Sequence, residues 1–219
     1  MSDRLPGPPP PRRRGRPPRR AQAETAMHDT RTLLLRIGLE VLTEKGYGAS
    51  GLDEILRRAG VTKSSFYHCF DGKEAFGLAL VEAYADYFAR KLDRHLLDAT
   101  RTPLQRLDGF IDEASAGLVR HDFRRGCLIG NLGQEMAALP ESFRARLLAV
   151  LADWQTRTAR CLQAAREAGE IAADAEVERL ADFFWTGWEG AVLRARLERS
   201  TRPLRQHAEG FAALLRAGA

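Results

Sequence analysis

Residues 52–76 read LDEILRRAGVTKSSFYHCFDGKEAF, which predicts two short helices joined by a tight turn. The first helix is indicated by apolar residues that recur on one helix face, namely Leu52, Ile55, Leu56 and Ala59. Gly60 suits the left-handed conformation that ends many helices, because it has no side chain to clash. Thr62 is a favoured N-cap, so we expect a second helix from Lys63 to about His68.

The second helix is predicted to bury Phe66 and to expose the residues around it. Two helices joined by a glycine-containing turn form a helix-turn-helix, whose second helix enters the major groove of DNA. We therefore expect base contacts from Lys63, Ser64 and Ser65, and phosphate contacts from Thr62, Tyr67, His68 and Lys73. The geometry alone also fits an ordinary corner between two helices in any all-α protein.

The complete string is more specific than the helix-turn-helix pattern. Residues 59–70 and 73–75 resemble the TetR family of repressors, whose members typically read AGVSKGTFYHYFxxKEAL. Gly46, Tyr47, Ser50 and residues 53–55 match as well, whereas Cys69 departs from the aromatic or histidine residue that is commoner there. The resemblance implies an all-α fold, with an N-terminal three-helix helix-turn-helix domain and a C-terminal six-helix domain for ligand binding and dimerisation. It also implies a palindromic double-stranded operator.

The net charge of +5 is concentrated at the N-terminus, where residues 1–20 hold seven arginines and one aspartate. Seven of the ten prolines lie in the first 18 residues, so residues 1–23 are expected to form a disordered basic arm. Within it, RGRP resembles the core of an AT-hook, which places Arg14 and Arg16 in an A·T-rich minor groove. A generic polyanion-binding tail is the alternative.

Other features of the composition favour a cytoplasmic protein without a cofactor. Three distant cysteines argue against a zinc site or a disulfide framework. There is no signal-peptide pattern and no apolar run that could cross a membrane. No metal-ligand cluster, catalytic triad or pair of carboxylates at an informative spacing is present, so we do not expect an enzyme.

Helical patterns continue through the rest of the ordered chain. Residues 24–72 are assigned to the DNA-binding domain, with a first helix over residues 24–45, and residues 73–219 to the effector-binding and dimerisation domain. Further helices are expected over residues 72–97, 102–120, 126–139, 141–168, 174–199 and 203–217. The helix over residues 174–199 is apolar or small nearly all round, which predicts burial on two sides. We expect a homodimer through the last two helices, although a core helix of a monomer would have the same pattern.

The effector site is expected among seven residues of the second domain: Tyr84, Cys127, Asn131, Trp154, Trp185, Trp188 and Glu189. The tryptophans can wall a pocket or simply fill the core. Glu189 lies in an apolar run and needs a partner, for which Arg194 or Arg196 is available. Cys127 follows two arginines at a predicted helix start, which would lower the thiol pKa, although a small buried hydrophobe is the alternative.

Two further segments indicate a subgroup within the TetR family. They are GCLIGNLGQEMAAL, over residues 126–139, and GWEGAVLRAR, over residues 187–196. They are similar to a subgroup of TetR regulators that includes reactive-electrophile sensors and an acrylate-responsive repressor. The resemblance implies a repressor that leaves its operator on binding a small unsaturated acid. The alternative is a repressor that senses electrophiles or oxidants through Cys127. The residues favour neither an enzyme with a vestigial DNA domain nor a non-specific chromatin-like protein.

Overall fold

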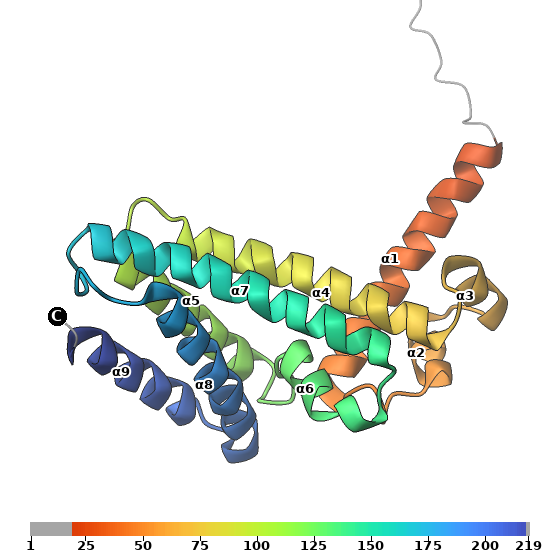
Figure 1. Ribbon diagram of the computed structural model, residues 1–219. Coiled ribbons are helices and arrows are strands. Elements are labelled where there is room, and N and C mark those ends of the chain that lie inside the picture. The colour runs from red at the N-terminus through yellow and green to blue at the C-terminus, as the bar shows by residue number, and fades with distance from the viewer. Residues whose placement is uncertain (1–18, 218–219) are drawn as a thin grey trace, which may run out of the picture.

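The computed structural model describes residues 19–217, which fold into helices arranged as a small head and a longer body (Figure 1). The helices are α1 (Arg19–Lys45), α2 (Leu52–Ala59), α3 (Lys63–Cys69), α4 (Lys73–Leu96), α5 (Pro103–Arg120), α6 (Leu128–Gln134), the 3-10 turn η1 (Met136–Ala138), α7 (Glu141–Glu167), α8 (Val177–Glu198) and α9 (Arg202–Ala217). The all-α prediction is confirmed for these residues. None of the helices over residues 19–217 is long and apolar enough to cross a membrane.

The start of α1 differs from the prediction. Residues 19–23 were expected to belong to the arm, but α1 already begins at Arg19. The sequence RRAQAE consists of good helix formers, so the helix extends back toward the prolines. The RGRP segment, with Arg14 and Arg16, lies outside the described residues.

The head is built from α1, α2 and α3 around a cluster of aromatic rings. The ring centroid of Phe66 lies 5.4 Å from that of Phe76, and the Phe70 and Phe76 centroids are 4.8 Å apart. Gly38 lets α4 approach α1, because a Cβ there would lie 2.7 Å from the Phe76 ring. The first turns of α4 therefore complete the core of the head, and the same helix continues into the body.

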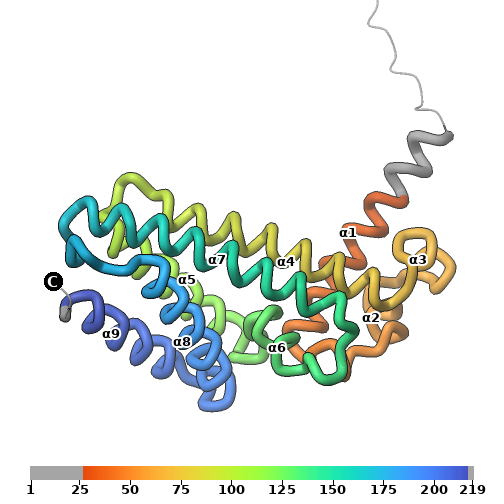
Figure 2. Tube along the Cα trace, in the orientation of Figure 1, coloured from red at the N-terminus to blue at the C-terminus, as the bar shows by residue number. Residues whose placement is uncertain are grey.

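In the body, α4 and α7 run side by side as the longest pair, and α8 and α9 form a hairpin at the far end (Figures 1 and 2). The core between α4, α5, α7 and α8 is aromatic. Trp154 lies 4.3 Å from Phe88 and 4.9 Å from Trp185 between ring centroids, and all three residues are buried. The indole N–H of Trp185 donates to the hydroxyl of Thr158 at 3.0 Å. Trp154 and Trp185 therefore belong to the aromatic core of the body.

The segment 126–139 was expected to form a single short helix, and this was wrong. α6 ends at Gln134, and η1 begins two residues later. The break falls at Glu135, whose side chain points away to the head. The carboxylate of Glu135 accepts hydrogen bonds from the loop between α1 and α2, and this long-range contact accompanies the interruption.

Candidate DNA-reading head and body cavity

Local sequence holds α3 so that one face is presented to solvent. Gly60 adopts the left-handed conformation with φ 64°, as predicted. The hydroxyl of Thr62 accepts a hydrogen bond from the backbone N–H of Ser65 at 3.1 Å and caps the helix. Phe66 is fully buried and fixes the rotation of α3 about its axis. The opposite face is therefore free to meet a partner.

Most of the predicted DNA-contacting residues lie on that free face. Thr62, Lys63, Ser64 and His68 are exposed, and Tyr67 keeps 54% of its surface accessible. Ser65 is the exception: it is half-buried, and its hydroxyl lies 2.9 Å from that of Thr62.

Two cations flank this face from neighbouring helices. The Lys73 ammonium lies 4.4 Å above the ring of Tyr47 and donates to its carbonyl at 3.4 Å. Arg31, which the sequence reasoning missed, stacks 4.4 Å over Phe70 and donates to the carbonyl of Cys69 at 3.1 Å. Both side chains remain exposed, so the rim of α3 is positively charged.

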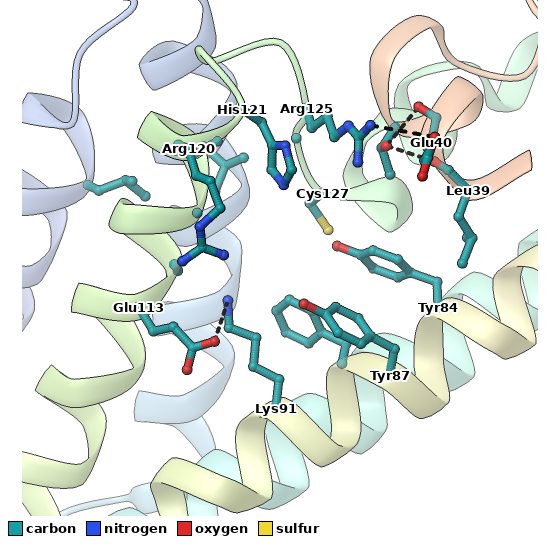
Figure 3. A pocket seen from close by; sticks show the side chains of 18 of the residues that line it. Leu39, Glu40, Tyr84, Tyr87, Lys91, Glu113, Arg120, His121, Arg125 and Cys127 are labelled. Carbon is teal, nitrogen blue, oxygen red and sulfur yellow. Dashed lines mark hydrogen bonds and ion pairs between the residues drawn. The ribbon is translucent and has the colours of Figure 1, made fainter. Parts of the chain in front are cut away.

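The body contains a cavity of about 350 Å³ between α1, α4, α5, α8 and the loop that leads into α6 (Figure 3). This volume lies within the usual range for small-molecule sites. Its lining combines aromatic rings with several charged side chains. The residues that matter below are Tyr84, Tyr87, Lys91, Glu113, Arg120, His121, Arg125, Cys127 and Trp188.

One side of the cavity is rich in cations, and we call Lys91, Arg120 and His121 the cationic side. Lys91 has only 10% of its side chain accessible and lies 3.7 Å from Glu113. Burial lowers the pKa of Lys91, and Glu113 opposes this shift. Desolvation together with the positive charges of Arg125 and Arg120 lowers the pKa of His121. The side chain of Arg120 points into the opening and makes no hydrogen bond or ion pair with another described residue (Figure 3).

At the floor of the cavity, the thiol of Cys127 lies near the carboxyl group of Glu189. The Tyr84 hydroxyl faces the sulfur of Cys127 (Figure 3), and the Glu189 carboxyl group lies with Cys127 against Gly130. Burial, and then the nearby Glu189, raises the pKa of the Cys127 thiol well above its usual value. Burial also raises the pKa of Glu189 to about 7. The thiol is therefore uncharged at neutral pH, whereas Glu189 is partly ionised.

Two expectations about these residues are overturned. The Cys127 thiol was expected to have a lowered pKa, but its neighbour Arg125 turns away to Glu44, at 3.2 Å, and Glu40, at 3.9 Å. Glu189 was expected to pair with Arg194 or Arg196. Arg194 instead donates to Glu198 at 2.6 Å, and the contacts of Arg196 lie at the junction with the head.

The seven predicted effector residues fall into three groups. Tyr84, Cys127 and Trp188 line the cavity, and Glu189 lies behind Cys127. Trp154 and Trp185 belong to the aromatic core, and Asn131 lies at the junction with the head.

Several residues that line the cavity were not predicted from the sequence, although they recur at helical spacing. On α4, Tyr87 is 53% exposed and follows Tyr84 by three residues, with Lys91 four residues further on. On α5, Arg120 follows Glu113 by seven residues. Such spacings place residues on one helix face, so this periodicity was a usable signal.

The loop before α6 and α6 itself also bind the end of α1. The Asn131 amide donates to the carbonyl of Thr43 at 3.2 Å, and the backbone N–H of Gly126 donates to the same carbonyl at 3.3 Å. Arg196 of α8 donates to Asn131 at 2.9 Å and to the carbonyl of Glu44 at 3.3 Å. The segment that carries Cys127 is thus bonded to the helix that precedes the helix-turn-helix.

Glu135 makes the most direct link to the head. Its carboxylate accepts hydrogen bonds from the backbone N–H groups of Tyr47, at 3.1 Å, and Gly48, at 2.7 Å. Gly46 has φ +83°, and a Cβ there would lie 1.9 Å from the carboxylate. The loop between α1 and α2 is therefore shaped around this side chain.

Comparison with known proteins gives consistent matches over nearly the whole chain. Residues 34–80 match the family described as bacterial regulatory proteins, tetR family, and residues 103–211 match a tetracyclin repressor-like C-terminal domain. The chain is 52% identical over 211 residues to the transcriptional regulator AcuR of Cereibacter sphaeroides, covering 96% of this chain and 94% of that protein. It is 34% identical over 173 residues to the HTH-type transcriptional repressor DhaR of Mycobacterium sp. strain GP1, covering 79% and 85%. The crystal structure of regulatory protein TetR from Rhodobacter sphaeroides has a TM-score of 0.82 at 54% identity, covering 84% of this chain and 97% of that one.

Proposed function

The chain belongs to the TetR family of bacterial transcriptional regulators, and we propose that a small carboxylic acid in its body cavity releases it from operator DNA. It is a DNA-binding repressor of this family and not an enzyme, in agreement with the sequence-based expectation. The observation that carries the proposed effector response is Arg120, an arginine without a partner among the described residues that points into a cavity bonded to the DNA-reading head.

DNA recognition is assigned to the exposed face of α3. Lys63 and Ser64 are exposed and can reach base edges, although the Lys63 ammonium lies 3.8 Å from the exposed Asp53 carboxylate. The Ser65 hydroxyl can do so as well, beside the Thr62 hydroxyl at 2.9 Å. Tyr67 and His68 are placed to hold phosphates, and so are Thr62 and Lys73. Arg14 and Arg16 would add minor-groove contacts on the flank.

The effector is assigned to the class of small unsaturated acids, of which acrylate is the first candidate. The resemblance of residues 126–139 and 187–196 to acrylate-responsive repressors suggested this class, and the cationic side of the cavity supports it. A carboxylate near Arg120 can accept a bidentate pair of hydrogen bonds, which is the geometry that guanidinium groups favour. Lys91 would add positive charge near the same group.

In this proposal, α6 couples acid binding in the cavity to the position of the DNA-reading head. An acid that draws Arg120 and Arg125 toward itself competes with the ion pairs that join Arg125 to Glu40 and Glu44 of α1. The same loop enters α6, whose end carries Glu135 and its bonds to the α1–α2 loop. Induction is then a population shift toward conformers whose two heads no longer match the half-site spacing.

The dimer contact is assigned to α8 and α9. Phe183, Leu193 and Leu197 of α8 and Leu214 of α9 are exposed apolar residues, with Leu197 75% accessible. A hairpin that exposes this many large apolar side chains fits an interface with a second copy, because monomers rarely expose such patches. Two heads can then read both halves of a palindrome. A cytoplasmic location is proposed with it, since the partner is chromosomal DNA.

A second candidate is a thiol switch on the same scaffold. It is favoured by the position of Cys127, whose sulfur borders the cavity and is reachable by a bound electrophile. The raised pKa of this thiol argues against ready oxidation. In this version, Cys127→Ser would abolish induction and leave operator binding intact.

Fluorescence anisotropy tests the proposed function. Labelled DNA from upstream of the protein's own gene is titrated with protein, with random DNA as control, in the presence and absence of acrylate. Specific binding that acrylate reverses in native protein, but not in Arg120→Gln, supports the proposal. Operator binding that no small acid disturbs would discard the ligand and keep the repressor.

A further inference from the structure

The Glu189 carboxyl group and the side chain of Cys127 both lie against Gly130, and Cys127 also lines the cavity. Glu189 is half-buried as a residue, but its Oε1 is fully enclosed and has no hydrogen-bond partner in the described part of the chain. Its Oε2 lies against Gly130, where a Cβ would come within 2.0 Å. The fold thus leaves room for a carboxyl group whose hydrogen-bonding capacity it does not use, beside a thiol that borders an open cavity.

A carboxyl group beside Cys127 can compensate for the low reactivity of its buried thiol. A neutral, buried thiol is a poor nucleophile, because the thiolate is the reactive form. A neighbouring base can take the proton while the new bond forms, as in Cys–His pairs, so that no free thiolate is required. A carboxyl group with a pKa of about 7 is partly ionised at neutral pH and is suited to this role.

We propose that Glu189 is the general base with which Cys127 adds covalently to the carbon–carbon double bond of an α,β-unsaturated acid held at the cationic side of the cavity. The inference rests on the proposed function, because the acid must occupy the same cavity. As Sγ bonds to the β-carbon, the S–H bond breaks and its proton passes to the Glu189 carboxylate. The π electrons move to the α-carbon, which then receives a proton from Glu189. The net change is addition of S–H across the double bond, and no oxidant or further reactant is needed.

The cationic side contributes to the same step. Addition to an ionised enoate places a second negative charge next to the carboxylate, which makes such acids weak acceptors in water. The positively charged side chains of Arg120 and Lys91 face this region of the cavity (Figure 3). Fixed positive charges placed where charge develops stabilise the transition state. The structure therefore favours an anionic acceptor over a neutral one of equal size.

The test follows adduct formation by intact mass, with peptide mapping to assign the modified cysteine. Native protein, Glu189→Gln and Cys127→Ser are incubated from pH 5.5 to 8.5 with acrylate, its neutral analogue acrylamide, or saturated propionate. Native Cys127 should gain one acrylate, faster than acrylamide, and propionate should give no adduct. Glu189→Gln should slow the reaction about 100-fold near neutral pH and abolish the rise in rate through pH 7. Glu189→Asp, which keeps a carboxylate, should restore part of the rate.

Two other cysteines serve as internal controls. Cys161 is also buried, and its thiol donates to the carbonyl of Pro103 at 3.3 Å, so burial without a base such as Glu189 beside the thiol should leave it unmodified. Cys69 is half-buried on the head, and Glu189→Gln should not change its rate. Thermal melting confirms that each variant is folded before the rates are compared.

The outcomes separate this inference from the proposed function. If Cys127 gains no adduct, or if Glu189→Gln reacts with the native rate and pH profile, the inference is overturned. Release of the operator by acrylate would still stand in that case. If the adduct forms with the expected dependence on Glu189 but the operator is not released, the inference holds and the proposed function fails.

Discussion

Replacing Glu135 by alanine removes the carboxylate around which the α1–α2 loop is folded. The two hydrogen bonds lost, at 2.7 and 3.1 Å, both join a charged acceptor to a backbone N–H group. Hydrogen bonds to charged groups contribute about 1.5–3 kcal/mol each when sheltered. Gly48 is exposed and Glu135 is half-buried, so a total of about 2 kcal/mol is reasonable. That corresponds to roughly 30-fold in an equilibrium constant.

We expect the loss to appear in the coupling between acid and operator. The assay measures the operator dissociation constant with and without saturating acrylate, and the ratio of the two is the coupling factor. In Glu135→Ala this factor should fall by up to roughly 30-fold, whereas acid affinity in the absence of DNA should change little. Urea unfolding should show a loss of about 2 kcal/mol in the free energy of unfolding.

Gln134→Ala is the matched control. Gln134 precedes Glu135 on α6, is exposed, and donates only within its own helix, to the carbonyl of Gly130 at 3.3 Å. It should keep the native coupling factor. A native coupling factor in Glu135→Ala, with normal operator and acid binding, would refute the role given to this contact.

Further predictions concern the cationic side, the dimer, the head and the floor. Arg120→Gln should weaken acrylate binding about 10- to 100-fold in calorimetry and leave operator affinity unchanged. Leu197→Glu should shift light scattering from dimer to monomer at micromolar concentration and weaken operator binding with it. Tyr67→Phe should weaken binding to operator and random DNA alike, whereas Lys63→Ala should lose affinity mainly for the operator; equal losses for Lys63→Ala would contradict this division. Because the folded-state pKa of Glu189 is raised to about 7, native stability should fall as pH rises from about 4.5 to 7, and Glu189→Gln should remove that slope in urea titrations.

The head was predictable because its signals are local. Gly60 at a left-handed turn and Thr62 as an N-cap act within a few residues, and Phe66 fixes which face of α3 is buried. Such features can be read from a single segment of sequence. Apart from the half-buried Ser65, the residues of the exposed face followed from them without knowledge of the body.

The cavity was only partly predictable because its chemistry depends on distant contacts. Arg125 adjoins Cys127 in sequence, yet it pairs with Glu44, which lies 81 positions away in sequence. The thiol pKa is therefore governed by burial and Glu189 rather than by its arginine neighbours. Lys91 and Arg120 lie on helix faces that periodicity can define, but the packing of α4 against α5 determines that both face one cavity.

The interruption between α6 and η1 has the same origin. Residues 126–139 have no proline before Pro140, and helix propensity alone favours continuation. The carboxylate of Glu135 bonds to Tyr47 and Gly48, 88 and 87 positions earlier. A contact at that separation carries no local signature.

The most direct test of the account is the effect of acrylate on operator binding by native protein and by Arg120→Gln, measured side by side by fluorescence anisotropy. The account predicts that both proteins bind the operator with similar affinity and that acrylate releases only the native protein at concentrations near its own dissociation constant. Equal release of both proteins would show that the acid does not act through the cationic side of the cavity and would contradict the central claim.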